Sequence, residues 1–149
     1  MQPADLARAA MRLADADPGR AIGAAAHAVR VARRAGDLAS VALAEQAWGA
    51  ALSQAGEVDG AIRHLRRAAA HDSDVGRQAR MKLAFALVQR GRLPAALHEV
   101  DVALRGLVGH AHAVALAQRA VIRYQAGRLA DAYVDYQAAV PVLRRSDDR

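Results

Sequence analysis

Apolar residues recur every three or four positions through most of the chain, as they do on one face of an α-helix. No stretch shows a convincing alternation of apolar and polar residues, which would indicate a β-strand. The pattern therefore predicts an all-α protein of about eight helices. Four of the expected helices span residues 3–16, 38–55, 58–71 and 110–126, as the first, third, fourth and seventh. The second reaches residue 35, the fifth ends at 90, the sixth begins at Pro94 and the eighth begins at 129.

One helical hairpin, residues 43–70, recurs twice further along the chain. Its turn glycine is Gly56, and Gly91 and Gly127 follow at steps of 35 and 36 residues, which is a period of stacked helical hairpins, an α-solenoid. Small residues stand at fixed offsets from these glycines: Gly49, Ala84 and Ala120 seven residues before, Ala61, Ala96 and Ala132 five after, and Ala68, Ala103 and Ala139 twelve after. Because two helices approach closely only where small side chains face each other, we expect Gly49 and Ala61 to mark a helix crossing, with Leu65 beside it.

This spacing resembles the tetratricopeptide repeat (TPR) family, which has small residues at its eighth, twentieth and twenty-seventh positions and a turn glycine at its fifteenth. The aromatic residue of the family's fourth position is absent, since Glu45, Arg80 and Leu116 stand there. The resemblance implies one TPR-like domain over residues 1–149, with hairpins at about 3–35, 38–71, 73–107 and 110–145. The segments DPGRA and RRAGD also resemble the TPR region of actinobacterial CHAT-domain and regulatory proteins.

The composition excludes several classes of protein and of binding site. The net charge of +6 is carried by arginine, with Lys82 the only lysine, and this bias together with abundant alanine is typical of an actinobacterial genome. The chain has no cysteine, which excludes disulfides, thiolate zinc sites and a cysteine nucleophile. No apolar run approaches the roughly 20 residues that span a membrane, and charged residues interrupt the first 16 positions, where a secretory signal would lie. We therefore expect a cytoplasmic protein without a membrane partner.

In the resembled family, the first helix of each hairpin lines a concave groove. Transferred to this sequence, the resemblance implies a peptide-binding groove formed by Gln46, Ala50, Gln54, Met81, Lys82, Phe85, Gln89, Gln118, Val121, Tyr124 and Gln125. One groove position is glutamine in all three regular repeats, at Gln54, Gln89 and Gln125. A carboxamide both donates to and accepts from a peptide backbone, and Phe85 and Tyr124 could hold side chains of that peptide. Glutamine is also a good helix former on a solvated surface, and the sequence leaves both interpretations open.

Other chemistries find little support. A clamp for the acidic tails of heat-shock proteins needs asparagine and lysine, and the chain has no asparagine. His98 and Glu99 begin like a zinc-protease helix, but Val102 stands where the second histidine is required. There is no glycine-rich phosphate loop and no G-x-S-x-G motif. We expect no catalytic residues, no metal and no cofactor, and hence no enzyme.

Six arginines fall on the second helices of the first two hairpins, where the resemblance places the convex side: Arg30, Arg33, Arg34, Arg63, Arg66 and Arg67. Such a stripe could contact phosphates. No aromatic residue is interleaved for base stacking, and Asp59 interrupts the stripe. The sequence favours a solvated surface here, and nucleic-acid binding remains only an alternative.

The last helix carries Pro141, which we expect to kink or end it. Apolar residues of this helix are left without a following polar capping helix: Tyr133, Tyr136, Val140 and Leu143. This end is then expected to continue into a larger protein or to pack on a partner or on a second copy. The sequence thus predicts a protein–protein interaction module whose concave groove binds a peptide or protein segment, with self-assembly through the C-terminal helix as an alternative.

Overall fold

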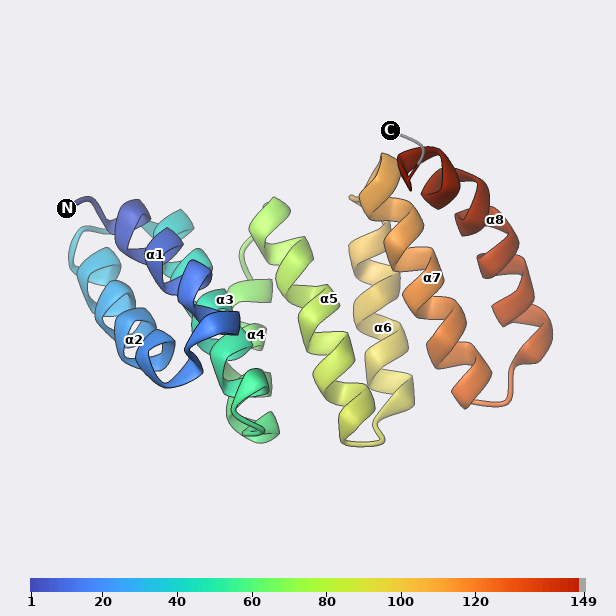
Figure 1. Ribbon diagram of the computed structural model, residues 1–149, viewed down its shortest axis with the longest axis horizontal. Coiled ribbons are helices and arrows are strands. Elements are labelled where there is room, and N and C mark those ends of the chain that lie inside the picture. The colour runs from blue at the N-terminus through green and yellow to red at the C-terminus, as the bar shows by residue number, and fades with distance from the viewer. Residues whose placement is uncertain (148–149) are drawn as a thin grey trace. The chain divides into compact units, whose positions relative to one another are not determined.

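The computed structural model describes residues 1–147 and contains in that range eight α-helices and no strand (Figure 1). The helices are α1 (Pro3–Ala16), α2 (Pro18–Arg34), α3 (Leu38–Gln54), α4 (Val58–Ala69), α5 (Asp74–Gln89), α6 (Leu93–Leu104), α7 (Gly109–Gln125) and α8 (Leu129–Asp147). The prediction of an all-α chain is confirmed, and the helix bounds that the sequence predicted differ from these by at most two residues. None of these helices is both long and apolar enough to cross a bilayer.

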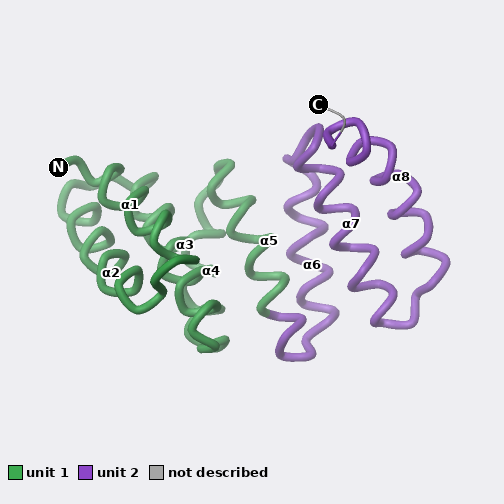
Figure 2. The backbone as a smooth tube through the Cα atoms, viewed as in Figure 1, with its two compact units in different colours: residues 1–86 green, residues 87–149 purple. Residues whose placement is uncertain are grey.

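The chain divides into two compact units, residues 1–86 and residues 87–149 (Figure 2). In unit 1, α1 pairs with α2 and α3 pairs with α4, and α3 also packs against both helices of the first hairpin. In unit 2, α7 packs against α6 and α8. The boundary falls inside α5, so most of that helix belongs to unit 1 and its last residues to unit 2.

The turn glycines end their helices in the left-handed conformation that the repeat pattern predicts. The φ angles of Gly56, Gly91 and Gly127 are +80°, +71° and +79°. The backbone N–H of the residue after each glycine donates to the carbonyl five residues earlier, at 2.9 Å for Gly56 and Gly91 and at 2.8 Å for Gly127. This is the hydrogen-bond pattern of a Schellman motif, which satisfies carbonyls at a helix C-terminus.

Alanine forms the centre of unit 1 in three successive layers. Each layer contains one buried alanine from each of α1, α2 and α3: Ala7, Ala28 and Ala44; Ala10, Ala25 and Ala47; and Ala14, Ala21 and Ala51. Larger side chains, among them Leu6, Met11 and Trp48, pack around these layers. Because alanine adds little bulk, the three helix backbones approach closely along the whole length of the hairpin.

The crossing of α3 and α4 lies where the sequence predicted it. A Cβ atom added at Gly49 would lie 2.5 Å from Cγ of Leu65 and 3.2 Å from the carbonyl oxygen of Ala61. Leu65 and Ala61 are fully buried, so neither neighbour can move into solvent.

We expect Gly49→Ala to lower the free energy of unfolding by about 1 kcal/mol, because overpacking costs more than the helix propensity of alanine returns. The matched control is Gly23→Ala on α2, where an added Cβ meets no atom within 4 Å. That variant should raise stability by about 0.5 kcal/mol. Urea denaturation followed by circular dichroism measures both, and an equal gain from the two substitutions would contradict the close crossing.

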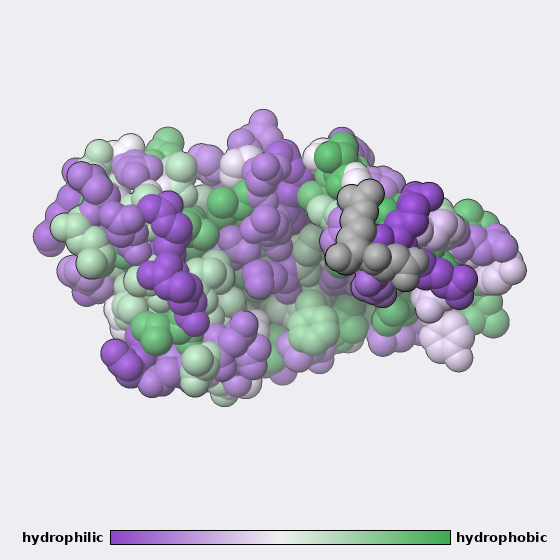
Figure 3. Space-filling model, turned by 45° about the horizontal axis from the view of Figure 1, so that its top comes forward, coloured by the Kyte–Doolittle hydropathy of each residue, from purple (hydrophilic) through white to green (hydrophobic). Residues whose placement is uncertain are grey.

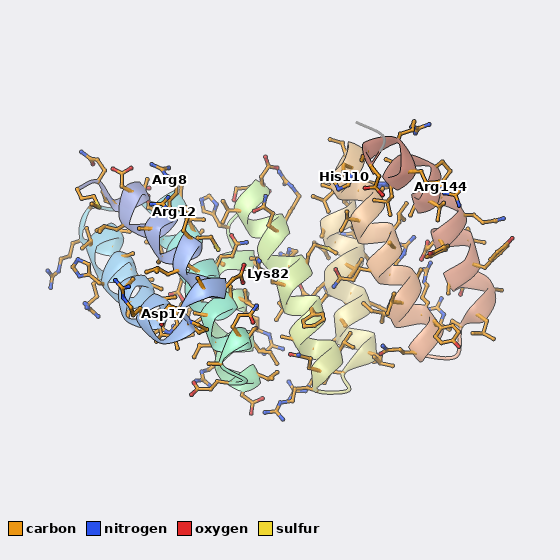
Figure 4. All side chains as sticks on the ribbon, viewed as in Figure 1. Arg8, Arg12, Asp17, Lys82, His110 and Arg144 are labelled. Atoms are coloured by element: carbon orange, nitrogen blue, oxygen red, sulfur yellow. The ribbon has the colours of Figure 1, made fainter. Side chains whose placement is uncertain are left out.

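Pro141 does not end the last helix, because α8 continues for six residues beyond it. Of the two outcomes that the sequence predicted, a kink or an end, the prediction of an end is wrong, and the ribbon bends towards its C-terminus (Figure 1). The proline is exposed, so water can hydrate the carbonyl that loses its helical donor. The continuation is also held at its far end, where Nδ1 of His110 lies 2.9 Å from Oγ of Ser146. Figure 4 shows His110 and Arg144 at this end of α7 and α8.

Candidate functional site

An apolar cleft of about 500 Å³ lies between α7 and α8 in unit 2. Its lining residues are Ala120, Val121 and Tyr124 from α7 with Leu129, Ala132, Tyr133 and Tyr136 from the start of α8 and the turn before it. None of these residues is charged, and they include all three tyrosines of the chain. The cleft thus gathers aromatic side chains in a sequence of which only 3% is aromatic.

The repeat pattern explains the shape of this cleft. Ala120 and Ala132 are the small residues of the α7–α8 crossing and are buried at its floor. Tyr124, Tyr133 and Tyr136 form the walls and are mostly exposed. Close approach of the backbones at the floor and large rings at the walls leave a hollow whose accessible surface is apolar.

Tyr136 stands at a position that is interior in the preceding repeats. It lies nine residues after its turn glycine, as do Leu65 and Val100 in the second and third hairpins. Leu65 and Val100 have no exposed surface, whereas 58% of Tyr136 is exposed. In the fourth hairpin, an apolar side chain at a core position is therefore accessible to a ligand.

A buried ionic cluster fixes the two walls of the cleft relative to each other. Asp135 on α8 is 3% exposed and accepts three hydrogen bonds from arginines of α7. Nε and Nη2 of Arg119 donate to its two carboxylate oxygens at 2.9 and 2.7 Å, and Nη1 of Arg123 donates at 2.7 Å. Nη1 of Arg119 also donates to Asp101 on α6 at 2.9 Å. The cluster thus links α6, α7 and α8 through one guanidinium group.

The hydrogen bond with Asp135 raises the pKa of Arg119, which outweighs the lowering by burial, and Asp101 raises it further. The guanidinium is therefore charged at neutral pH. A bidentate arginine–carboxylate pair also restricts geometry more than a single hydrogen bond does. The pair therefore adds a geometric restraint between α7 and α8 beside the cleft.

Unit 1 contains a second buried carboxylate, on α3. Glu45 is 1% exposed, and Nδ1 of His64 on α4 donates to its Oε2 at 2.6 Å. Nη2 of Arg33 on α2 donates to Oε1 at 3.2 Å, and Nη1 of Arg67 lies 3.8 Å from the same oxygen. The His64 ring stacks on Trp48 with 3.9 Å between ring centroids and 16° between planes. Glu45 thus stands where the resembled family has an aromatic residue, and its polar contacts join α2, α3 and α4.

The sequence analysis missed both networks, although a signal for them is present. An ionisable residue stands eight residues after each turn glycine, at His64, Glu99 and Asp135. Two of these side chains, His64 and Asp135, are buried in hydrogen-bonded contact with the other helix of their own hairpin. A recurring ionisable residue at one repeat position could therefore have indicated polar pairing inside the hairpins.

The residues that the sequence predicted for a groove are divided between the two units. Unit 1 holds Gln46, Ala50, Gln54, Met81, Lys82 and Phe85, and unit 2 holds Gln89, Gln118, Val121, Tyr124 and Gln125. Only Val121 and Tyr124 line the cleft. Figure 4 labels Lys82, an exposed side chain of α5.

Two of the predicted glutamines have notable environments in unit 1. Gln46 is 2% exposed, and its Oε1 has no hydrogen-bond partner in the structure. Because a buried side chain does not reach a ligand at the surface, Gln46 is not part of the binding surface proposed below. The amide of Gln54 is exposed, and its Nε2 donates to Asp15 at 3.1 Å. One member of the glutamine series is thus already paired within the chain.

Within residues 1–147, no three histidine, aspartate or glutamate side chains are grouped so that they could hold a metal ion. His98, which the sequence analysis considered as part of a zinc motif, is exposed on α6. The accessible chemical groups that the described residues offer include the aromatic and apolar side chains of the α7–α8 cleft in unit 2 and the exposed guanidinium groups of unit 1.

The structure is similar to solved helical-repeat structures. The crystal structure of BtubC (BKLC) from P. vanneervenii matches with a TM-score of 0.80 at 13% identity, covering 100% of this chain and 67% of that one. The crystal structure of MamA, a TPR-like protein, matches with a TM-score of 0.65 at 18% identity, covering 96% of this chain and 90% of that one. No protein-family model and no curated protein sequence matches the chain. At such identities the likeness shows the fold alone, and it confirms the prediction of a TPR-like α-solenoid.

Proposed function

We propose that this chain is a non-catalytic protein–protein interaction module that binds an apolar segment of a partner protein in the α7–α8 cleft. The observation that carries the proposal is the gathering of Tyr124, Tyr133 and Tyr136 around an uncharged hollow. Tyrosine is enriched in protein interfaces because its large ring gives contact area while its hydroxyl tolerates water. Contiguous exposed apolar surface on a protein commonly marks an interaction site.

The dimensions of the cleft suit a short segment of polypeptide. A volume of about 500 Å³ lies within the range of roughly 300–1,000 Å³ that is typical of ligand pockets. Because the lining carries no charge, the matching part of the partner is expected to be apolar as well. The TPR-like fold supports a protein partner, since helical repeats offer extended surfaces for binding rather than enclosed reaction sites.

Further residues predicted for the groove remain part of the proposal as additional contact surface in each unit. In unit 1 these are the half-buried Ala50 and Met81 and the exposed Gln54, Lys82 and Phe85. In unit 2 they are the half-buried Gln118 and the exposed Gln89 and Gln125.

A second hollow, of about 270 Å³, favours self-assembly as the alternative function. It is lined by Tyr136, Ala139, Val140, Leu143, Arg144 and Asp147 of α8. A surface that holds both a cation and an anion next to apolar residues can pair with its own copy across a two-fold axis. Sedimentation velocity of the wild type and of Leu143→Glu tests this alternative. Self-assembly through this hollow requires that the wild type be a dimer and the variant a monomer.

We expect Tyr136→Glu to raise the Kd of a cleft-binding peptide about thirtyfold, because an aromatic anchor of an interface contributes about 2 kcal/mol or more. The peptide is first selected from a displayed random library against the wild type, and its Kd is measured by fluorescence anisotropy. Val114→Glu is the matched control, since Val114 is an exposed residue of α7 that does not line the cleft. Its Kd should stay within about twofold of the wild-type value.

Circular dichroism of each variant establishes that it is folded. Selected peptides that bind the folded Tyr136→Glu variant as tightly as the wild type would place binding elsewhere on the chain.

A further inference from the structure

The motif R-x-x-R-R occurs twice in unit 1, at Arg30–Arg34 on α2 and at Arg63–Arg67 on α4, the second helices of two successive hairpins. The two copies are separated by 33 residues. The positions in α6 and α8 that correspond to the arginines of α4 hold His98, Asp101 and Val102, and Val134, Gln137 and Ala138. An arginine-rich composition alone would not place the motif on these two helices and leave it out of the other two.

All six arginines of the two motifs are exposed, and we call the surface they form the arginine face. Spacings of three and four residues place the three arginines of each helix on one side of it. Helix α2 contains no acidic residue, and α4 contains only Asp59. Within residues 1–147, Arg30, Arg34, Arg63 and Arg66 take part in no ion pair. Most of the positive charge of this face is therefore not neutralised by the chain itself.

The two helices present their motifs at the same place in unit 1. Arg33 of α2 and Arg67 of α4 lie 3.2 and 3.8 Å from the same oxygen of Glu45, so these two guanidinium nitrogens are no more than about 7 Å apart. More than half of each of the two side chains remains exposed. Since a guanidinium has five N–H donors, both groups keep donors that face solvent.

Helix polarity explains part of this pattern. Arg33 and Arg34, like Arg66 and Arg67, stand in the last turn of their helices, where a cation is favoured by the helix dipole. The effect falls off within that turn, so it does not account for Arg30 and Arg63. It also does not explain why the arginines of both helices lie near one another, with the buried carboxylate of Glu45 between Arg33 and Arg67.

We propose that the arginine face binds an acidic segment of a partner protein, independently of the α7–α8 cleft. Arginine matches carboxylates through pairs of parallel hydrogen bonds, and Arg33 already donates one hydrogen bond to the buried carboxylate of Glu45 beneath this face. The exposed large apolar residues of unit 1 are Met1, Leu38 and Phe85, and none of them lies on α2 or α4. Apart from the imidazole of His27, α2 and α4 therefore expose no ring for stacking on bases, and they expose no large apolar side chain for insertion into a membrane. Figure 3 shows hydrophilic residues intermixed with hydrophobic ones over the end that carries α1 and α2.

The test measures binding of a fluorescein-labelled decaglutamate peptide by anisotropy at low salt. The arginine-face variant combines Arg30→Gln, Arg34→Gln, Arg63→Gln and Arg66→Gln, which leaves the two arginines near Glu45 in place. The control combines Arg12→Gln, Arg92→Gln, Arg105→Gln and Arg145→Gln, four exposed arginines outside α2 and α4. Both variants change the net charge from +6 to +2, so they differ only in where the charge is removed.

We expect the Kd of the peptide to rise at least about tenfold in the arginine-face variant and at most about threefold in the control. Wild-type binding should also weaken as salt is raised, because the contacts are between exposed charges. An equal loss in the two variants would overturn the proposal, since it would show a response to net charge alone. Tighter binding of a ten-nucleotide single-stranded DNA or of phosphatidylserine vesicles, lost in the same variant, would overturn it in favour of that class of partner.

Discussion

Asp135→Ala is expected to lower the free energy of unfolding of unit 2 by about 3 kcal/mol. The carboxylate is buried and accepts three hydrogen bonds, so its removal leaves the guanidinium groups of Arg119 and Arg123 without their main partner. These side chains are 20% and 18% exposed, and they would have to stay largely buried and unpaired or rearrange towards water. Because partial access to water limits the penalty, the expected loss is at the lower end of the range for a broken buried ion pair.

The same helix offers a matched control. Asp131 pairs with Arg128 across an exposed turn, with about half of each side chain in solvent. We expect Asp131→Ala to change stability by no more than about 0.5 kcal/mol, as is usual for exposed pairs. Urea denaturation by far-UV circular dichroism reports both units, while fluorescence of Trp48, the only tryptophan, reports unit 1. Equal effects of the two substitutions would show that the Asp135 cluster does not hold α7 on α8.

The stability of this cluster bears on the proposed function. Val121 and Tyr124 on α7 and Tyr133 and Tyr136 on α8 form opposite sides of the cleft, and Asp135 lies between the two tyrosines of α8 in sequence. A binding surface made by two helices needs a fixed distance between them, because affinity depends on a preorganised shape. The buried ion pair is directional, so we expect it to restrict the position of α7 on α8 more than an apolar contact would.

The helices and their turns could be predicted from the sequence because local rules decide them. A glycine such as Gly56 ends a helix in the left-handed conformation whatever packs against it. Small residues at fixed repeat offsets likewise mark a crossing, as Gly49 does against Leu65. The fold class follows from these features, since they recur at the period of helical hairpins. The prediction of a single domain over all four hairpins stays a prediction.

The polar contacts could not be predicted in the same way. The 3.6-residue period places Asp135 on the face of Ala132 and Ala139, but it does not show which arginine of another helix reaches it. Gln46 was assigned to a groove by its repeat position, and its burial depends on neighbours that the period does not specify. Pro141 was expected to kink or end its helix by a local rule, and contacts near Ser146 hold the helix beyond it. The partners and burial of long polar side chains thus depend on tertiary packing more than the positions of alanine and glycine do.

Glu45→Ala is expected to lower the free energy of unfolding of unit 1 by about 3 kcal/mol. The loss has two parts: His64, which is nearly buried, loses the acceptor of its Nδ1–H, and the removed side-chain atoms leave a cavity between α3 and α4. Arg33 and Arg67 contribute less, because more than half of each side chain is exposed and can be hydrated. Since the His64 ring stacks on Trp48, the near-ultraviolet circular dichroism of the tryptophan should fall as well.

Two further variants separate the contribution of the Glu45 side chain to stability from the effect of removing one negative charge. Glu57→Ala removes the same charge from an exposed position whose side chain makes no capping hydrogen bond, and it should change stability by less than about 0.5 kcal/mol. Glu45→Gln keeps the shape and one acceptor oxygen for His64, so its loss should lie between those of the two alanine variants. Full stability of Glu45→Ala with an unchanged Trp48 signal would mean that alanine packing alone positions α3 against α4. A loss that is largest for Glu45→Ala and smallest for Glu57→Ala would show instead that the carboxylate of Glu45, which stands where the resembled family has an aromatic residue, holds His64 and through it Trp48.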